Sequence, residues 1–321
     1  MEIEVLFLGT AGSAPTRGRG LPSTLVRCGG EQLLFDCGEG TQRQLLRSGG
    51  LVALDAVFIT HFHADHFLGL PGMLKTFSLQ GRDAPLAVHG PPGLKALFDA
   101  LRPVIGRVTY DLSLVEVEAG TPVPGAGYTV TSFGVAHGVP AYGYAIVEDV
   151  RPGRFDAARA RELGVEEGPD FGRLQGGEPV QGSLGQVRPE QVLGDARAGR
   201  KVVISGDTAP SEMTRVAAHE ASLLVHEATF GHADAERAAA TGHSTGQAAA
   251  MLAAQAQVTL LALVHISQRY QPSEIEQEAR EAFPNTVVPR DFDRVEVPFP
   301  ERGAPVHVPR QKREPPGAPG G

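Results

Sequence analysis

The sequence has 321 residues, of which 41% are hydrophobic and 21% charged, and its formal net charge is −8. This composition is typical of a globular protein and excludes disorder over most of the chain. The negative net charge argues against a protein that coats nucleic acid through a pervasive positive field, so any RNA binding must be local. No run reaches the ~18 apolar residues that a membrane helix requires. The first residues show no signal-peptide pattern, so we expect a soluble, cytoplasmic protein.

Short apolar runs bounded by glycine and polar residues predict alternating strands and helices in the first half of the chain. Strands are expected at residues 3–8, 24–27, 32–35, 56–60, 86–89, 128–133 and 142–147. Helices are expected at residues 41–48, 68–80 and 94–105. In residues 151–192 strand-like runs vanish while glycine, proline and charges of both signs recur, which indicates an insertion.

Regular patterns return after this insertion, and three predicted strands each lead into a polar residue. These strands are expected at residues 201–205, 222–225 and 259–264, followed by Asp207, His226 and His265, respectively. An alanine-rich helix is expected at 245–256, with Ser244 or Thr245 near its N-cap. Proline, glycine and arginine dominate residues 301–321, which we interpret as a disordered tail.

The strongest chemical signal is the motif H-x-H-x-D-H at residues 61–66, directly after an apolar strand. Imidazole and carboxylate groups are zinc ligands, and a catalytic zinc site keeps a position open for water. In an extended turn His61 and His63 point to the same side, so Asp65 and His66 can serve a second ion. One motif can therefore begin two metal sites.

The remaining ligands must come from other strand ends. The best candidates are His137, Asp207 and His265. His226, followed by Glu227, and His243, followed by Ser244, form a different case, because each histidine lies at the edge of a predicted element next to a polar partner and could serve either capping or chemistry. A carboxylate such as Glu227 bonded to an imidazole would suit a proton donor. A structural or solvent role is expected for the other isolated histidines, namely His89, His219, His232 and His307.

With these motifs the chain resembles the metallo-β-lactamase superfamily and, within it, the short, homodimeric ribonuclease Z family. The additional motifs that carry this resemblance are His226-Glu227-Ala228-Thr229, His243-Ser244-Thr245, residues 265–270 and the insertion near Gly168-Pro169. The resemblance implies an α/β fold, an αββα sandwich of the metallo-β-lactamase type with an inserted flexible arm. Residues 1–300 would form the catalytic domain and residues 151–192 the arm, an exosite for tRNA.

Carried over by position, the resemblance implies two Zn²⁺ per chain, with Mn²⁺ or Fe²⁺ as possible occupants. His61, His63 and His137 would hold one ion, Asp65, His66 and His265 the other, and Asp207 would bridge both. Asp65 would act as general base, and His243, supported by Glu227, as proton donor. The implied reaction removes the 3′ trailer from precursor tRNA, leaving a 3′ hydroxyl on the tRNA and a 5′ phosphate on the trailer.

The resemblance also implies residues that contact the substrate. Gly168 and Pro169 lie in the arm, where five arginines and five acidic residues between 151 and 175 argue against a simple cationic clamp. The loop after the first strand carries Arg17 and Arg19, although it departs from the P-x-K-x-R-N pattern of many short relatives. Arg269 follows the late histidine. All five are expected substrate-binding residues.

Three other functions remain open from the residues. A small-molecule thioesterase or lactonase would share the H-x-H-x-D-H motif but not the additional motifs. A 3′ exoribonuclease activity could coexist with endonucleolytic cleavage in one site. A noncatalytic RNA-binding scaffold conflicts with the intact set of seven ligands.

Overall fold

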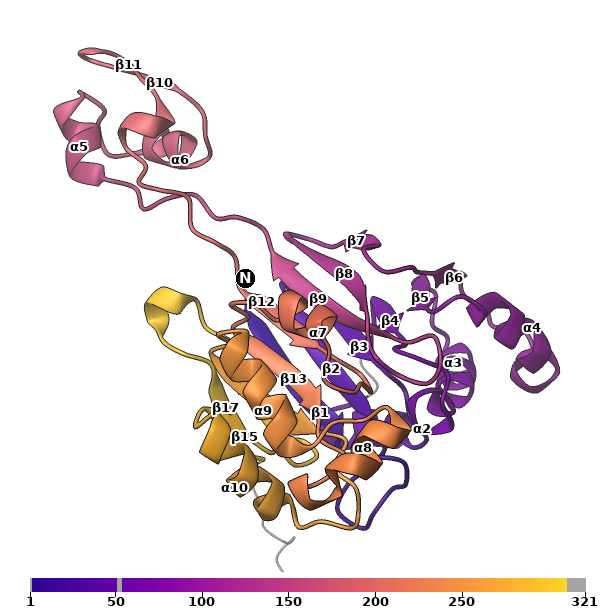
Figure 1. Ribbon diagram of the computed structural model, residues 1–321. Helices are drawn as coiled ribbons and strands as arrows, with labels where there is room; N and C mark the ends of the chain where they lie inside the picture. Colours follow the sequence, from indigo (N-terminus) through magenta and orange to yellow (C-terminus); the bar gives the residue numbers. More distant parts are fainter. Residues whose placement is uncertain (1, 51–53, 311–321) are drawn as a thin grey trace, which may run out of the picture. The chain divides into compact units, whose positions relative to one another are not determined.

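The computed structural model describes residues 2–50 and 54–310. It divides the chain into two compact units, one of residues 1–146 and 200–321 and the other of residues 147–199. Figure 1 gives the labels of the helices and strands used below. Among the described residues, no helix is long and apolar enough to cross a membrane.

The first sheet of the larger unit has the order β17-β16-β1-β2-β3-β4-β5-β6. It is antiparallel from β17 to β3 and parallel from β3 to β6. Its strands are β1 (Ile3–Gly9), β2 (Ser23–Cys28), β3 (Glu31–Phe35), β4 (Ala56–Phe58), β5 (Leu86–Gly90), β6 (Leu112–Glu116), β16 (Arg294–Glu296) and β17 (Val306–Val308).

The second sheet has the order β15-β14-β13-β12-β9-β8-β7 and is parallel from β12 to β15. Its strands are β7 (Pro122–Pro124), β8 (Tyr128–Gly134), β9 (Tyr142–Glu148), β12 (Lys201–Ile204), β13 (Leu223–Glu227), β14 (Leu260–Val264) and β15 (Thr286–Val287). The carboxyl ends of parallel strands meet at one edge of a sheet. Asp207, Glu227 and His265 therefore come together although they are far apart in the sequence.

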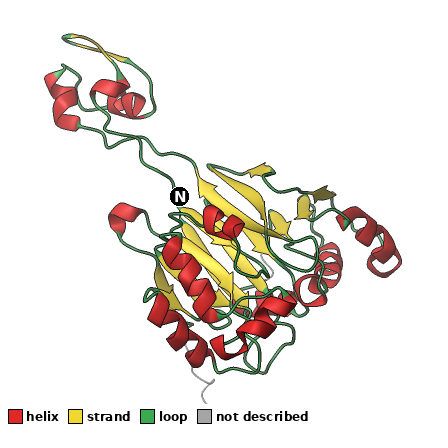
Figure 2. Ribbon diagram, viewed as in Figure 1, coloured by secondary structure: helices red, strands yellow, loops and turns green. Residues whose placement is uncertain are grey.

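Three hydrophobic clusters hold the larger unit as four layers, with helices outside and strands inside (Figure 2). Alternating side chains such as Phe35, Phe58 and Tyr144 fill the space between the sheets. The outer face of the first sheet packs against α1 (Thr41–Ser48), α3 (Gly69–Leu79) and α4 (Leu94–Ile105). The second sheet packs against α7 (Glu212–Ala217), α9 (Gly246–Gln255) and α10 (Pro272–Ala282). The expected αββα sandwich is confirmed.

The smaller unit contains regular structure that the sequence analysis did not predict there. Its elements are α5 (Ala157–Glu162), α6 (Pro169–Gln175), β10 (Val180–Gly182), β11 (Gly185–Val187) and a 3₁₀ turn at Pro189–Gln191. Helices of six and seven residues and strands of three are too short to give a clear hydrophobic period. The unit has its own small core, formed by Ala160, Val165, Leu174, Val180, Val187 and Val192.

The structure corrects the expected boundary of the tail. Residues 301–310 include the end of a 3₁₀ turn at Pro300–Arg302 and strand β17, which pairs with β16. The reason is a tertiary contact, because His307 Nε2 lies 2.9 Å from the Asp293 carboxylate. Residues 311–321 of the predicted tail lie outside the described residues.

Several elements of the larger unit were also missed or misplaced. Strand β13 runs on through His226 and Glu227 rather than ending before them. The sequence pattern did not predict helix α10, helix α8 (Ala235–Thr241) or the short strands β6, β7 and β15 to β17. Tertiary pairing rather than a long apolar run stabilises these short strands.

Candidate metal centre

The H-x-H-x-D-H motif lies where β4 passes into the one-turn helix α2 (Ala64–Phe67). His61 and His63 belong to the extended segment before this helix, and His63 is its N-cap residue. Asp65 and His66 follow within the helical turn. The change from extended to helical backbone thus presents two pairs of side chains from six consecutive residues.

One group of possible ligands comprises His61, His63, His137 and Asp207. His63 Nδ1 lies 2.9 Å from His61 Nε2 and 3.2 Å from His137 Nε2. His61 Nε2 lies 3.8 Å from Asp207 Oδ2. His61 and Asp207 are buried whereas His63 is exposed, so the group opens to solvent on the His63 side.

A second group comprises Asp65, His66 and His265. His265 Nε2 lies 3.3 Å from both His66 Nε2 and Asp65 Oδ2. Asp207 Oδ1 approaches His66 Nε2 at 3.3 Å and His265 Nε2 at 3.4 Å. Because its other oxygen faces His61, Asp207 lies between the two groups. All seven predicted ligand side chains are thus brought together.

Polar groups outside this cluster orient its imidazoles. Each of four histidines has its Nδ1 next to an oxygen: His61 to Thr60 Oγ1 (3.0 Å), His66 to Asp36 Oδ2 (2.7 Å), His137 to Gly242 O (2.9 Å) and His265 to Thr229 Oγ1 (2.8 Å). Such partners fix the proton on Nδ1, which leaves the Nε2 lone pair for a metal ion. In all four residues Nε2 is the atom that points into the cluster.

These features fit a site for divalent cations. Imidazole nitrogens that face one another without protons repel, and a cation between them removes this repulsion. Asp207 Oδ1 is buried and has no hydrogen-bond partner in the described part of the chain, which is costly unless a cation contacts it. Burial lowers the pKa of His61 to about 2, so its imidazole is neutral and able to bind a metal near pH 7. The donor set of nitrogen and carboxylate oxygen suits zinc.

Glu227 and His243 form a pair next to the two groups. His243 Nδ1 lies 2.8 Å from Glu227 Oε1 and 3.9 Å from Asp207 Oδ2. Glu227 is buried, and its carboxylate accepts hydrogen bonds from Thr208 N (3.0 Å) and from the backbone and hydroxyl of Thr229. Burial lowers the pKa of His243, but the bond to Glu227 outweighs it and the pKa is raised. His243 also belongs to a third possible ligand group with Asp207 and His265.

Several residues that support the site were not among the predicted ones. Asp36 contacts His66 and accepts hydrogen bonds from the backbone and hydroxyl of Thr60. Ser13 N donates to Asp65 Oδ2 at 3.0 Å. Asp36 could have been suspected, because it is a carboxylate directly after strand β3, and Asp207 likewise lies just beyond the end of β12. Ser13 and Thr229 give no comparable signal.

The predicted substrate-binding residues occupy several places. Arg17 and Arg269 are exposed, and Gly168 and Pro169 stand at the start of α6 in the smaller unit. Arg19, by contrast, is partly buried and bonded within the fold. Its Nη1 donates to Thr10 Oγ1 at 2.6 Å and to the carbonyl of Pro289 at 2.8 Å, so it joins two segments of the fold.

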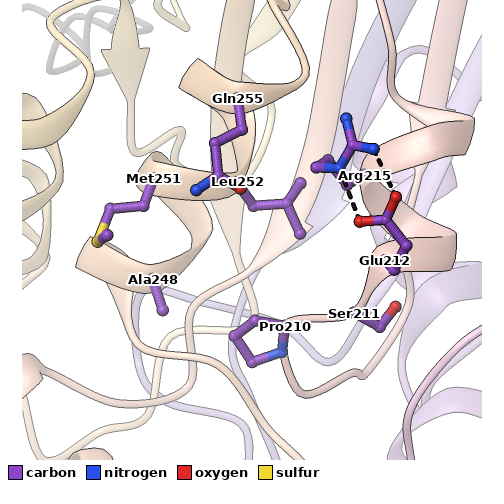
Figure 3. Close-up of a pocket in the computed structure, with 8 residues that line it drawn as sticks. All are labelled: Pro210, Ser211, Glu212, Arg215, Ala248, Met251, Leu252 and Gln255. Atoms are coloured by element: carbon purple, nitrogen blue, oxygen red, sulfur yellow. Dashed lines mark hydrogen bonds and ion pairs between the residues drawn. The ribbon is translucent and has the colours of Figure 1, made fainter.

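A hollow of about 300 Å³ between α7 and α9 is a different kind of site (Figure 3). Its charged residues, Glu212 and Arg215, are paired at 2.5 Å, and its other side chains include Pro210, Met251 and Leu252. The described residues that line the hollow include no histidine and no cysteine. The hollow therefore has no groups suited to metal-dependent chemistry.

Comparison with known proteins agrees with this geometry. Residues 17–264 match the metallo-β-lactamase superfamily. A ribonuclease Z of Natronomonas pharaonis is 46% identical over 307 residues, covering 94% of this chain and 100% of the relative. One of Myxococcus xanthus is 46% identical over 302 residues, covering 92% and 98%. The crystal structure of human tRNase Z, short form, has a TM-score of 0.67 at 28% identity, covering 92% of this chain and all of that one.

The two curated relatives extend over almost the whole chain at an identity well above the level at which fold alone is shared. They therefore confirm the resemblance expected from the histidine motifs. This chain belongs to the ribonuclease Z family of the metallo-β-lactamase superfamily.

Proposed function

We propose that this protein is a metal-dependent endoribonuclease that removes the 3′ trailer from precursor tRNA. The observation that carries this proposal is the Glu227–His243 pair beside the seven ligand side chains. A thioester hydrolase releases a thiolate, which leaves readily without a proton. Cleavage of RNA at a 3′ oxygen releases an alkoxide, which needs a proton donor. The relatives named ribonuclease Z support the same choice.

The ligand side chains would hold two divalent ions, for which we propose zinc. His61, His63 and His137 would contact one ion, Asp65, His66 and His265 the other, and Asp207 both. When bound, such ions lower the pKa of the attacking water and neutralise charge that develops on the phosphate. Asp65 would accept the proton of that water. Its Oδ2 is held by the Ser13 amide at 3.0 Å, which fixes the direction of the carboxylate.

His243 would protonate the departing 3′ oxygen. Glu227 keeps the imidazole oriented through Nδ1, so Nε2 is the atom available to the substrate. Because Glu227 raises the pKa of His243, the imidazole retains its proton closer to neutral pH. The water attacks phosphorus, the bond from phosphorus to the 3′ oxygen breaks, and the proton of His243 completes the new 3′ hydroxyl. The phosphate stays on the 5′ end of the trailer.

The smaller unit would be the tRNA exosite. Three of its arginines are neutralised within the unit: Arg159 pairs with Glu162 at 3.0 Å, Arg161 with Glu167 at 2.6 Å and Arg173 with Asp170 at 3.3 Å. Such pairs leave little net charge for phosphates. Recognition would therefore depend on shape and on backbone amides, including those near Gly168 and Pro169.

We also propose that the enzyme is a homodimer and acts in the cytoplasm, as the family resemblance implies. Equilibrium sedimentation of the purified full chain would measure the subunit number. A single species with the mass of one chain at micromolar concentration would contradict the dimer.

Replacing residues 155–193 with a short Gly/Ser linker tests the role of the smaller unit in tRNA cleavage. The cut points are suitable because Gly194 N bonds to Arg154 O at 3.0 Å, so a short linker can join them. Remote binding energy places a large substrate but cannot act on a small one. We expect a fall of at least about 10²-fold in kcat/KM for precursor tRNA and nearly unchanged hydrolysis of bis(p-nitrophenyl) phosphate.

Two results would oppose this assignment. Equal losses on both substrates would mean that the segment supports the metal centre. An undiminished rate on precursor tRNA would mean that recognition lies elsewhere. A double exchange of Arg159 and Glu162, which reverses one internal ion pair but keeps the fold, serves as the matched control and should retain most activity.

A further inference from the structure

A second feature of the larger unit is a surface groove of about 550 Å³. It is bounded by the loop after β1, by helix α1 and by the chain near β17. We call it the arginine groove, because Arg17, Arg43, Arg47 and Arg310 line it with exposed side chains.

The charge of the arginine groove is not cancelled locally. In the described part of the chain, none of these four guanidinium groups forms an ion pair with a carboxylate. Other surface arginines do form ion pairs: Arg102 pairs with Asp99, and Arg215 pairs with Glu212. A concentration of unpaired cations on a protein of net charge −8 is a local site for an anion.

The acidic residues of the groove do not change this conclusion. Asp291 is buried, and its oxygens accept hydrogen bonds from Thr10 Oγ1 (2.8 Å), Gly20 N (2.6 Å) and Gln44 Nε2 (2.7 Å). It therefore serves the fold rather than the surface cations. Glu39 is the other acidic residue of the lining and is exposed. One surface carboxylate faces four surface arginines.

The groove also offers a flat surface. The half-buried ring of Phe292 has the guanidinium carbon of Arg47 at 4.9 Å and that of Arg310 at 4.7 Å from its centre. Planar guanidinium groups on an aromatic ring are surfaces on which unpaired bases stack. Phosphate-binding cations beside such a platform favour a single-stranded nucleic acid over a small anion.

The groove is joined to the metal centre by one loop. Gly12 N donates to Ile266 O at 3.1 Å, next to His265, and Ser13 N donates to Asp65. The same loop continues through Pro15 to Gly20 along the groove. A strand that leaves the centre past Asp65 would enter the groove.

We propose that the arginine groove binds the single-stranded 3′ trailer of the precursor, an inference that rests on the proposed function. In-line displacement places the attacking water opposite the leaving 3′ oxygen. His243 contacts Glu227 and marks the leaving side, where the tRNA body lies. The loop of the groove contacts Asp65, the residue proposed to accept the proton of the attacking water. The trailer stays bonded to phosphorus through its 5′ oxygen, apart from the departing 3′ oxygen, and can follow this loop into the groove.

Direct binding tests this proposal without requiring catalysis. The probe is a fluorescent, unstructured oligoribonucleotide with a 5′ phosphate, titrated with the metal-loaded full chain. The Arg43→Glu, Arg310→Glu double variant should bind it at least about 10-fold more weakly than the wild type. Its plot of log affinity against log salt should be shallower by about 1.4, since each lost phosphate contact of a single strand accounts for about 0.7.

The matched control is Arg107→Glu, at an exposed arginine outside the groove whose side chain has no described partner. It changes net charge by half as much and should keep affinity within about twofold. Arg43 has no described contact either, so Arg43→Glu alone provides a second groove variant that leaves the packing around Phe292 intact. Undiminished binding by both groove variants would overturn the proposal.

Cleavage assays identify which part of the RNA the groove holds. Two precursors are compared, one with a single-nucleotide trailer and one with a long unstructured trailer. The double variant should lose about 10-fold in kcat/KM on the long trailer only. An equal loss on both precursors would overturn the proposal in favour of a contact with the tRNA body. If the wild type cleaves neither precursor, the proposed function fails, and the binding experiment still decides whether the groove holds RNA.

Discussion

Asp36→Asn isolates the contribution of a residue that touches no metal ligand other than His66. Asp36 has a left-handed backbone, with φ at 58°, and asparagine tolerates that conformation well. The variant should therefore fold. The carboxylate accepts from His66 Nδ1 at 2.7 Å and from Thr60 N at 2.8 Å. The two bonds fall on different oxygens, Oδ2 and Oδ1, and asparagine has an oxygen at only one of these positions, so it cannot accept both bonds in this geometry.

If the amide oxygen of the substituted side chain keeps the hydrogen bond from Thr60 N, the amide NH₂ group faces the Nδ1 proton of His66. The imidazole must then rotate or move its proton to Nε2, and either change removes the lone pair offered to a metal. Losing a hydrogen bond to a charged group costs about 1.5–3 kcal/mol. Loss of such a supporting partner corresponds to roughly a 10- to 100-fold weaker metal affinity.

The assay is a competitive titration of the zinc-loaded protein with a chromophoric chelator. We expect Asp36→Asn to release one of two ions more easily, while the ion held by His61, His63 and His137 keeps its affinity. Asp55→Asn is the control, because this exposed carboxylate accepts a single backbone bond from Gln32. Wild-type affinity for both ions in Asp36→Asn would refute the role of Asp36 in orienting His66.

Three further changes test other contacts. Asp207→Ala should remove both ions and nearly all turnover, since this carboxylate faces both groups; elemental analysis showing two retained ions would oppose the bridging role. His243→Ala should keep both ions but slow cleavage by about 10²- to 10⁴-fold; loss of an ion would instead make His243 a ligand. Burial raises the pKa of Asp293, but His307 and two backbone amides outweigh it and hold it below 3.8. Asp293→Asn should therefore cost about 2 kcal/mol of unfolding free energy at pH 7. The difference should shrink below about pH 4, where the carboxylate of the unfolded chain gains a proton first and that of the folded chain follows at lower pH. A constant difference in urea unfolding from pH 7 to pH 3 would refute this linkage.

The ligand side chains could be predicted because their signal is local. A short apolar strand followed directly, or after one glycine, by histidine or aspartate marks the carboxyl end of a strand, and this pattern occurs before His61, Asp207 and His265. Parallel pairing of β12, β13 and β14 then brings the carboxyl ends of these strands together. The family and the αββα fold were predicted for the same reason.

Other features could not be predicted because they depend on contacts across the chain. Asp36 supports His66 over 30 residues of sequence, and Arg19 reaches Pro289 over 270. No periodic pattern marks either contact. The small elements of residues 147–199 are too short to show hydrophobic periodicity. Packing in their shared core stabilises them, and the sequence pattern does not reveal that packing.

The most direct test of the proposed function uses purified protein and a precursor tRNA labelled at each end in turn. We predict a single cut at the junction with the trailer, a 3′ hydroxyl on the tRNA, an intact trailer with a 5′ phosphate, and loss of cleavage on removal of metal with restoration by zinc. A ladder of progressively shortened trailers would indicate exonucleolytic action instead. An uncut precursor together with rapid hydrolysis of a small ester or thioester would contradict the proposed function.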